Sequence, residues 1–475
     1  MAFSLSLDRL LTFTQGHPCP GSAPLPPHPL TGLSTDTRSL SPGQAFLALR
    51  GERFDGHQFL AQAQAQGAAV AIVDGDFQPS EADLALGLPL VQVANTLAAY
   101  QAIGQGWRRQ FAIPIIGVTG SVGKTTTKEL VAAMLATQGP VLKTEANYNN
   151  EIGVPKTLLN LRAEHRFAVI EMAMRGPGEI AELATIAEPT IGVITNVGVA
   201  HIERLGSREA IAAAKTELLE QMTRLEAETV QAGGKAGARR AILNADNALL
   251  MAAAAQRWQG TTATFGLERG DLRGKLLDPE TLQVGDDLFS LPLAGEHNAL
   301  NFLAALAVAE AVGIPRSALT QLQVTLPGGR AKRLVWGQTE PKGQDIIALD
   351  ETYNAGPESM AAALRLLKQL PGQRHLAVLG TMKELGPYSV PFHREVGELV
   401  AALAIDHLLI LADPAEAEAL AAGAAGVPTE VFADQASLVE RLGQTLQPGD
   451  RVLFKASRSV ALDQVIHQLQ PRFQP

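Results

Sequence analysis

Short apolar runs alternate with amphipathic stretches along most of the chain, and the alternation divides it into three blocks. Up to about residue 106, we expect an N-terminal amphipathic helix, strands in QAFLALRG and AAVAIVDG, and a helix in HQFLAQAQAQG. From about 107 to 326, the runs are short and nearly all apolar, which is typical of central parallel strands covered on both faces. From about 327 to 475, strand-like and helix-like segments alternate strictly, which indicates a doubly wound parallel sheet.

These blocks predict an α/β protein of three domains, over residues 1–106, 107–326 and 327–475. The first is expected to be a small α/β domain that docks a substrate, since no phosphate chemistry is evident there. In the second, the strand predicted in FAIPIIGVTG is followed by a glycine loop and by a helix in KTTTKELVAAMLATQG. The third is expected to be Rossmann-like.

Composition narrows the class of protein. The chain has 475 residues, 46% of them hydrophobic and 18% charged, and no apolar run is long enough to span a bilayer. Its single cysteine, Cys19, excludes an intrachain disulfide, and its N-terminal stretch lacks the features of a signal peptide. The formal net charge of −9 argues against nucleic-acid binding through a general basic field. We therefore expect a cytoplasmic protein with no nucleic-acid partner and no membrane insertion. We also expect a monomer.

The strongest chemical signal is a phosphate-binding loop in TGSVGKTT, although the first glycine of the usual GxxxxGKS/T pattern is replaced by Val118. Its glycines allow backbone N–H groups to point at a phosphate, and the following helix adds its positive N-terminal end. Lys124 is expected to bridge the β and γ phosphates, and the hydroxyl of Thr125 to hold magnesium. The nucleotide-binding residues expected in the loop are Gly120, Ser121, Gly123, Lys124, Thr125 and Thr126.

The loop is expected to bind ATP, because no guanine-reading motif of the Asn-Lys-x-Asp type follows a later strand. Magnesium bound to ATP needs hard ligands at neighbouring strand ends. Glu171 ends the strand FAVIEMAM and can supply one ligand, whereas His201, after the strand IGVITNVG, is open to a metal-binding or a structural role. For Lys215, in AAAKTELLE, the residues alone favour an ordinary surface lysine on a helix.

Several motifs in order resemble the Mur ligases of bacterial peptidoglycan synthesis, and together they cover nearly the whole chain. They are TGSVGKTTTKE, NYNNEIGVPKTLL, EMAMRGPGEI, TNVGVAHIERLGS, AKTELLE, GEHNALNFLAALAVA, LDETYNAGPESM and VLGTMKELGPYSVPFH. In that family TGxxGKT is the normal loop. Within it, STDTRSLSPGQAFLALRGERFDGHQF, YNAGPESM and LGTMKELG resemble the type that joins D-alanyl-D-alanine to UDP-N-acetylmuramoyl-tripeptide, which the resemblance implies as substrates.

The resemblance also implies an ADP-forming amide ligase that works through an acyl phosphate. Because a carboxylate and a triphosphate must meet, the site needs cations, namely Lys124, two magnesium ions and an arginine. Arg330, after the glycines of LPGGRAKRL, resembles the arginine that reaches the γ-phosphate, and its neighbours Lys332 and Arg333 do not fit that pattern.

The resemblance assigns further roles to individual residues. Glu171 and His201 resemble magnesium ligands, and Lys215 resembles a lysine that is carbamylated by carbon dioxide and then helps to hold the second metal ion. Asn298 and Asn301 resemble residues that read the adenine side of ATP, and lie on one face of a predicted helix. Asp350 resembles an aspartate that contacts the ribose, with Tyr353 and Asn354 bordering the same cleft.

Substrate contacts are implied in the first domain and near residue 144. The first domain would hold the uridine diphosphate end through Ser34, Asp36 and Arg38, with the turn at 55–57 nearby. Thr144 and Asn150, in TEANYNN, match a substrate-binding pattern in which Ala146 replaces the usual glycine. The segment 222–240 looks longer than in the family and is expected to be a surface loop.

The sequence leaves two alternative functions open and predicts one domain movement. One alternative is another ligase of the Mur or folylpolyglutamate type, although the Asp-Asn-Pro motif of the sister enzyme that adds the third residue is absent. The other is a P-loop ATPase that makes no bond. Because Arg330 and Asp350 must meet the nucleotide of the second domain, we expect the third domain to swing onto it about a hinge at 326–329.

Overall fold

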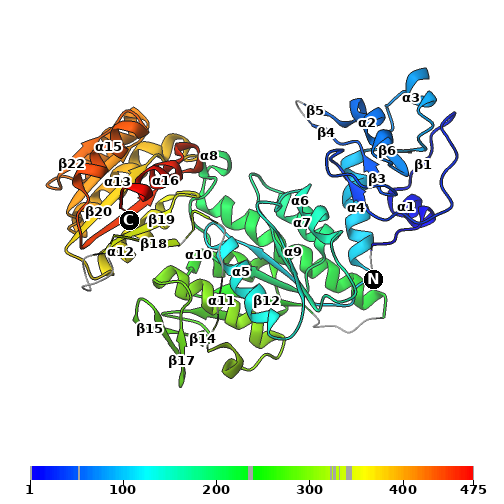
Figure 1. The fold of residues 1–475 in the computed structure, drawn as a ribbon. Helices are drawn as coiled ribbons and strands as arrows, with labels where there is room; N and C mark the ends of the chain where they lie inside the picture. The colour runs from blue at the N-terminus through cyan, green and yellow to red at the C-terminus, as the bar shows by residue number, and fades with distance from the viewer. Residues whose placement is uncertain are drawn as a thin grey trace.

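The computed structural model describes residues 3–51, 54–233, 239–320, 322, 324, 328–330, 332–337 and 345–473. It consists of three α/β bodies in a row, coloured blue, cyan to green, and yellow to red in Figure 1. Each body is built around its own mainly parallel sheet. The predicted class of three α/β domains is confirmed. Of the expected hinge at 326–329, Leu326 and Pro327 lie outside the described residues.

The N-terminal body has a five-stranded sheet in the order β1-β7-β6-β3-β2, and only β1 is antiparallel to its neighbour. The strands and helices predicted in this block are present. The elements are α1 (Leu7–Thr14), β1 (His17–Pro18), β2 (Leu33–Ser34), β3 (Ala45–Leu47), β4 (Arg50–Gly51), β5 (Phe54–Asp55), α2 (Leu60–Ala65), β6 (Val70–Asp74), α3 (Glu81–Ala85) and β7 (Leu90–Val93).

Helix α4 (Thr96–Arg108) joins the N-terminal body to the central one. Its N-cap is Asn95, whose side chain accepts a hydrogen bond from Ala98 N. The helix packs against α6 (Gly153–Leu158) and α7 (Glu179–Ala187) of the central body. Trp107 Nε1 donates to Leu161 O at 3.2 Å. The boundary predicted between residues 106 and 107 therefore falls inside this helix, near its end.

The central body contains a seven-stranded parallel sheet in the order β14-β13-β12-β11-β8-β10-β9. Alternate residues of a strand enter opposite cores: Ala168 and Ile170 pack on one face, and Phe167 and Val169 on the other. This two-sided burial explains why the strands are apolar throughout. The main elements are β8 (Ile115–Thr119), α5 (Lys124–Ala136), β9 (Val141–Lys143), α6 (Gly153–Leu158), β10 (Phe167–Glu171), α7 (Glu179–Ala187), β11 (Ile191–Ile194), α8 (Ile202–Leu205), α9 (Arg208–Gln231), β12 (Arg240–Asn244), α10 (Ala248–Arg257), β13 (Thr261–Gly266), β14 (Leu272–Arg273) and α11 (Glu296–Ala311).

Two features of the central body differ from the sequence-based expectation or go beyond it. The expectation of a surface loop over 222–240 is wrong for its first part, because α9 continues to Gln231 with Met222 and Leu225 buried. A three-stranded antiparallel sheet, which the apolar pattern did not predict, follows β14. Its strands are β15 (Lys275–Asp278), β16 (Thr281–Val284) and β17 (Asp287–Ser290).

The C-terminal body has a six-stranded sheet in the order β18-β19-β23-β20-β21-β22, parallel except for β18, as a doubly wound fold requires. Its elements are β18 (Lys332–Trp336), β19 (Ile346–Glu351), α12 (Pro357–Gln369), β20 (Arg374–Gly380), α13 (Ser389–Ala402), β21 (His407–Leu411), α14 (Pro414–Gly423), β22 (Thr429–Val431), α15 (Gln435–Thr445), β23 (Asp450–Lys455) and α16 (Leu462–Phe473). None of the helices in the described ranges combines the length and apolar character that a membrane span requires.

Candidate active site

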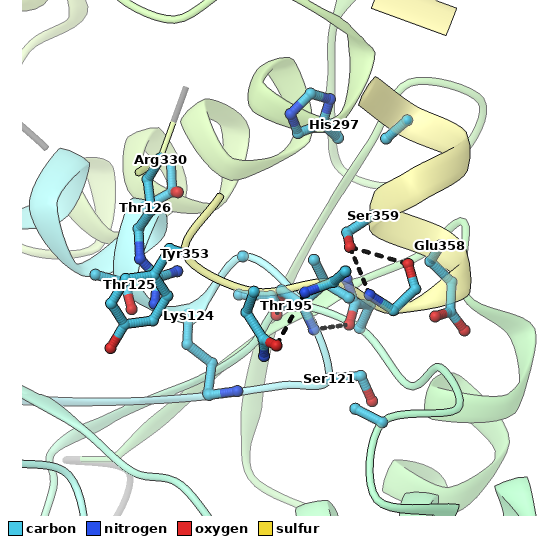
Figure 2. Close-up of a pocket in the computed structure, with 18 of the residues that line it drawn as sticks. Ser121, Lys124, Thr125, Thr126, Thr195, His297, Arg330, Tyr353, Glu358 and Ser359 are labelled. Carbon is cyan, nitrogen blue, oxygen red and sulfur yellow. Dashed lines mark hydrogen bonds between the residues drawn. The ribbon is translucent and has the colours of Figure 1, made fainter. Parts of the chain in front are cut away.

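A cavity of about 530 Å³ lies between the central and C-terminal bodies. The central body contributes the loop after β8 and residues that follow β10 and β11, and the C-terminal body contributes residues that follow β19, β20 and β23. Both sheets thus present the carboxyl ends of their strands to one space, where ligands of open α/β sheets bind. Its volume is in the range of small-molecule sites. Figure 2 shows residues of both bodies around it.

The phosphate loop joins β8 to α5, and its two glycines are required by close approaches. Gly120 has φ 151°, and a Cβ there would collide with Thr195 Oγ1. Gly123 has φ 85° at the N-cap of α5, and a Cβ there would collide with Asn301 Oδ1. The loop therefore has the strand–glycine–helix context predicted for it.

The segment after β11 holds the phosphate loop in shape. Ser121 N donates to Asn196 O at 3.1 Å, and Val122 N donates to Asn196 Oδ1 at 2.9 Å. Thr195 Oγ1 donates to Val122 O at 2.6 Å, and Gly198 N donates to Ser121 Oγ at 2.9 Å. The shape of the loop thus depends on residues more than 70 positions away.

Lys124 begins α5 and lines the cavity. Its Nζ donates to Gly120 O at 2.9 Å, so the ammonium group lies against its own loop. Burial lowers the pKa of Lys124, while the nearby Glu171 carboxylate opposes this effect. A phosphate at the loop would supply the negative charge that a buried ammonium group lacks.

Glu171 ends β10 and is bound by two neighbours from the cavity wall. Its Oε1 accepts from Thr125 Oγ1 at 3.2 Å and from Asn149 Nδ2 at 2.9 Å. Its Oε2 is buried without a hydrogen bond, 3.9 Å from Lys128 Nζ. Hydroxyl and carboxylate oxygens side by side are the ligands that magnesium accepts beside phosphates. Within the described ranges, no group of three or more His, Cys, Asp or Glu residues that could hold a metal ion is found.

His201 lies at the N-cap of α8 and lines the same cavity. Its Nδ1 is 2.6 Å from Oε2 of Glu384, which follows β20 in the C-terminal body. His201 lowers the pKa of the Glu384 carboxyl through this contact. The metal-binding role of His201 stays a prediction.

Arg330 lies on the segment between the two bodies and lines the cavity. Its guanidinium carbon is 3.8 Å from the ring centroid of Tyr353, and its Nε is buried without a hydrogen-bond partner. Figure 2 shows Arg330 and Tyr353 beside Lys124, Thr125 and Thr126. Neither Lys332 nor Arg333 lines the cavity, which agrees with the choice of Arg330 among the three cations.

Lys215 is buried in α9, with 1% of its surface exposed. The interpretation as a surface lysine is therefore wrong. Burial, and next the charge of Lys124, hold the pKa of the Lys215 amine well below its usual range. A neutral amine near Lys124 is the form that can react with carbon dioxide.

Asn298 and Asn301 form a hydrogen-bonded chain between α11 and α5. Asn298 Nδ2 donates to Ala294 O at 2.8 Å, and Asn301 Nδ2 donates to Asn298 Oδ1 at 3.3 Å. Asn301 Oδ1 accepts from Thr127 Oγ1 at 3.2 Å. Both asparagines line the cavity, and their contact with adenine stays a prediction.

Comparison with known proteins identifies relatives that match almost the whole chain. Residues 29–102 match the Mur ligase family catalytic domain, 118–309 the Mur ligase middle domain, and 333–458 the Mur ligase glutamate ligase domain. A Synechocystis protein, UDP-N-acetylmuramoyl-tripeptide--D-alanyl-D-alanine ligase, is 55% identical over 443 residues, or 93% of this chain and 92% of the relative. The chain belongs to the Mur ligase family.

Solved structures agree with this Mur ligase over nearly its full length. A structure of MurF from Acinetobacter baumannii has a TM-score of 0.85 at 32% identity and covers 98% of this chain and 99% of its own. A structure of MurF from Thermotoga maritima in complex with ADP has a TM-score of 0.78 at 30% identity and covers 93% and 97%. The family and the three-domain fold predicted from the sequence are thereby confirmed.

Some predicted residues of this Mur ligase lie behind the cavity wall. Asp350 Oδ1 accepts from Thr352 N at 3.2 Å and from Thr352 Oγ1 at 2.7 Å, so it fixes the turn after β19, and its neighbour Glu351 lines the cavity. Thr144 is fully buried, and its Oγ1 accepts from Glu171 N at 2.9 Å. Their direct ligand contacts therefore remain predictions.

The segment around Asn150 shows which residue of the motif faces the cavity. Asn150 Oδ1 accepts from Gly153 N at 2.9 Å, before α6, whereas Asn149 lines the cavity. Ala146, which departs from the family pattern, has φ 47°. It thus keeps a backbone conformation that favours glycine.

Replacing Ala146 with glycine is expected to raise the free energy of unfolding by up to about 1.6 kcal/mol. The left-handed conformation costs a residue with a Cβ about 1–2 kcal/mol, and the greater freedom of glycine in the unfolded chain offsets about 0.4–1 kcal/mol of that gain. The control is Ala252→Gly, at an exposed position in α10, which should lower the free energy of unfolding by about 1 kcal/mol. Denaturant unfolding measures both changes, and a loss of stability in Ala146→Gly would contradict the strain.

The predicted uridine-diphosphate residues lie in the N-terminal body, outside this cavity. Ser34 Oγ donates to Asp36 O at 2.9 Å, and Arg38 Nη2 is 2.7 Å from Asp36 Oδ2. Hydrogen bonds from Arg38 lower the pKa of Asp36 to about 2. In the nearby turn, the buried His57 places Nδ1 2.5 Å from Asp55 Oδ1 and accepts from Asp74 N at 3.0 Å, which is a structural role.

Sequence reasoning missed several residues of the cavity wall. They include Asn149, His297, Glu358, Glu384 and Lys455. His297 and Glu358 lie in the first turn of a helix, and Glu384 and Lys455 lie at or shortly after the end of a strand, which was the signal that could have found these four.

Proposed function

We propose that this protein is an ATP-dependent, ADP-forming ligase that joins D-alanyl-D-alanine to UDP-N-acetylmuramoyl-tripeptide. The observation that carries the proposal is one cavity that unites the phosphate loop, Glu171 and Arg330 with strand ends of the C-terminal body. The Synechocystis relative, whose name states this reaction, supports it at 55% identity. The ADP-bound Thermotoga maritima structure supports the use of ATP.

The reaction requires two transfers at one place. A carboxylate oxygen of the tripeptide attacks the γ-phosphorus of ATP, the bond to the β–γ bridging oxygen breaks, and ADP leaves. The amine of D-alanyl-D-alanine then attacks the acyl carbon, the nitrogen loses a proton, and inorganic phosphate leaves. Lys124 and Arg330 reduce the repulsion between carboxylate and triphosphate, because both cations line the cavity.

Magnesium fits the site through Thr125 and Glu171, whose oxygens are adjacent and face the nucleotide loop. When bound, the ion neutralises charge on the phosphates. Lys215 fits carbamylation because its amine is buried and deprotonates readily. His201 and the carbamylated Lys215 are the proposed ligands of a second ion.

The first domain is proposed to hold the uridine diphosphate end through Ser34, Asp36 and Arg38. The third domain is proposed to close over the second, so that the acyl phosphate is protected from water. We place the enzyme in the cytoplasm as a monomer. Its single cysteine, Cys19, is buried and supports a reducing compartment.

Release of ADP in the presence of magnesium tests the class of reaction. We expect release only when UDP-N-acetylmuramoyl-tripeptide and D-alanyl-D-alanine are both present, at one ADP per peptide bond. Release with ATP alone at the full rate would indicate a P-loop ATPase that makes no bond. Release with a folate or with a different amine in place of D-alanyl-D-alanine would indicate another ligase of the same fold.

A further inference from the structure

Residues 196–201, here called the bridging segment, lie between the phosphate loop and the C-terminal body. On one side, Asn196 accepts hydrogen bonds from Ser121 N and Val122 N, and Gly198 N donates to Ser121 Oγ. On the other side, two carboxylates of the C-terminal body contact the segment at Val199 and His201. The segment is therefore a physical link between domain docking and the shape of the loop.

The first carboxylate belongs to Glu358, in the first turn of α12. Its Oε1 accepts from Val199 N at 2.8 Å. A Cβ at Gly198 would collide with the same carboxylate, so the glycine permits the close approach. Figure 2 shows Glu358 at the start of α12, on the side of the cavity where Ser121 lies.

The second carboxylate belongs to Glu384, after β20. Its Oε2 is 2.6 Å from His201 Nδ1, and the two residues have φ values of 64° and 66°. Such values cost free energy for residues with side chains and persist only where surrounding contacts hold them. Carboxylates that contact the second ring nitrogen of a histidine orient the first one.

We propose that Glu358 and Glu384 are positioning residues that fix the bridging segment, and through it the phosphate loop and His201, when the C-terminal body is docked. Neither carboxylate is assigned to a reacting atom. Glu358 acts on the backbone of the segment, and Glu384 acts on the direction of the His201 ring. The proposal deepens the proposed function and rests on it, because it concerns the same ligation reaction.

The proposal separates turnover from binding of the UDP-linked substrate. The N-terminal body is attached to the central one by α4, which has its own hydrogen bonds to the central body. Losing Glu358 or Glu384 should therefore lower kcat and leave the KM for UDP-N-acetylmuramoyl-tripeptide within about twofold. A loss of about tenfold in kcat is expected for each alanine variant, as for other residues that orient a ligand.

The test compares Glu358→Ala, Glu384→Ala and the two glutamine variants with Glu440→Ala. Glu440 is exposed on α15, far along the same body, and Glu440→Ala should leave kcat unchanged. Each glutamine variant keeps an oxygen acceptor but loses the charge, so its kcat should fall by only about threefold. Thermal denaturation is recorded in parallel to show whether each variant is folded. If an alanine variant does not fold, the inference is tested with the glutamine variant at the same position, which should lose about threefold in kcat at unchanged KM.

A double-mutant cycle with His201→Ala tests the route through the histidine. Glu384→Ala should cost no further kcat in the His201→Ala background, because its effect passes through the ring. A full tenfold loss there, or alanine variants as active as Glu440→Ala in an enzyme that does ligate, would overturn the inference. Failure of the wild-type protein to ligate at all would instead reject the proposed function.

Discussion

Replacing Lys124 with alanine is expected to lower the turnover of ligation by about 10²–10³-fold. Lys124 begins the helix that follows the phosphate loop, and its ammonium group lies in the cavity wall. The transferred γ-phosphoryl group spreads negative charge over its oxygens, and a buried cation stabilises that charge more than one in water would. The fold should survive, because the side chain makes one hydrogen bond, to Gly120 O.

Steady-state kinetics of ADP release, with both substrates saturating, measure this loss. The matched control is Lys332→Ala, which removes an exposed lysine at the start of β18 that does not line the cavity. The control should retain normal turnover. Near-normal turnover in Lys124→Ala would contradict the assignment of the phosphate loop to the active site.

Replacing Lys215 with alanine is expected to lower turnover by about 100-fold, since the carbamate proposed as a metal ligand would be lost. Lys215 is buried, and the pKa of its amine is held well below the usual range. At neutral pH a larger neutral fraction is therefore ready to react with carbon dioxide, and the proposed carbamate would place an anion near Lys124. Adding acetate or another short carboxylate should restore part of the activity of Lys215→Ala, because the acid can occupy the space left by the side chain.

Turnover with and without added carboxylate measures the rescue, and ¹³C NMR with labelled bicarbonate detects the carbamate in the wild-type protein. The wild-type enzyme, treated with the same acids, is the control and should show no gain. Full activity in Lys215→Ala without any acid would leave Lys215 with a packing role only.

The phosphate loop could be predicted from the sequence because its chemistry is local. A buried strand, a glycine loop and a helix are consecutive in the chain, and Gly120, Gly123 and Lys124 take their places from that order. Glu171 could be predicted because it ends an apolar strand of the same parallel sheet. The carboxyl ends of such strands share one edge, so their side chains converge.

The sequence did not always distinguish residues that face the cavity from residues that lie behind its wall. Asn149 and Asn150 are neighbours in the motif, yet Asn149 donates to Glu171, whereas Asn150 accepts from Gly153 N at the start of a short helix. Asp350 and Glu351 differ in the same way, because successive residues near a strand end point in opposite directions. Which of two neighbouring side chains points into the cavity therefore depends on the exact residue at which the strand ends.

Contacts between the central and C-terminal bodies could not be predicted from the sequence pattern. Glu358 meets Val199, and Glu384 meets His201, across more than 150 positions of chain. The periodicity of a segment reports which face of that segment is buried and does not identify a partner so far along the chain. Lys215 was misjudged for a related reason, because the alanines around it allow close packing that only the folded sheet reveals.

The identity of the product tests the central claim most directly. The protein is incubated with ATP, magnesium, UDP-N-acetylmuramoyl-tripeptide and D-alanyl-D-alanine, and the products are identified by mass. We predict a UDP-linked product with the combined mass of the tripeptide substrate and the dipeptide less one water, formed together with one ADP and one phosphate. Consumption of ATP without this product, or its absence while another amine is joined to the tripeptide, would contradict the account.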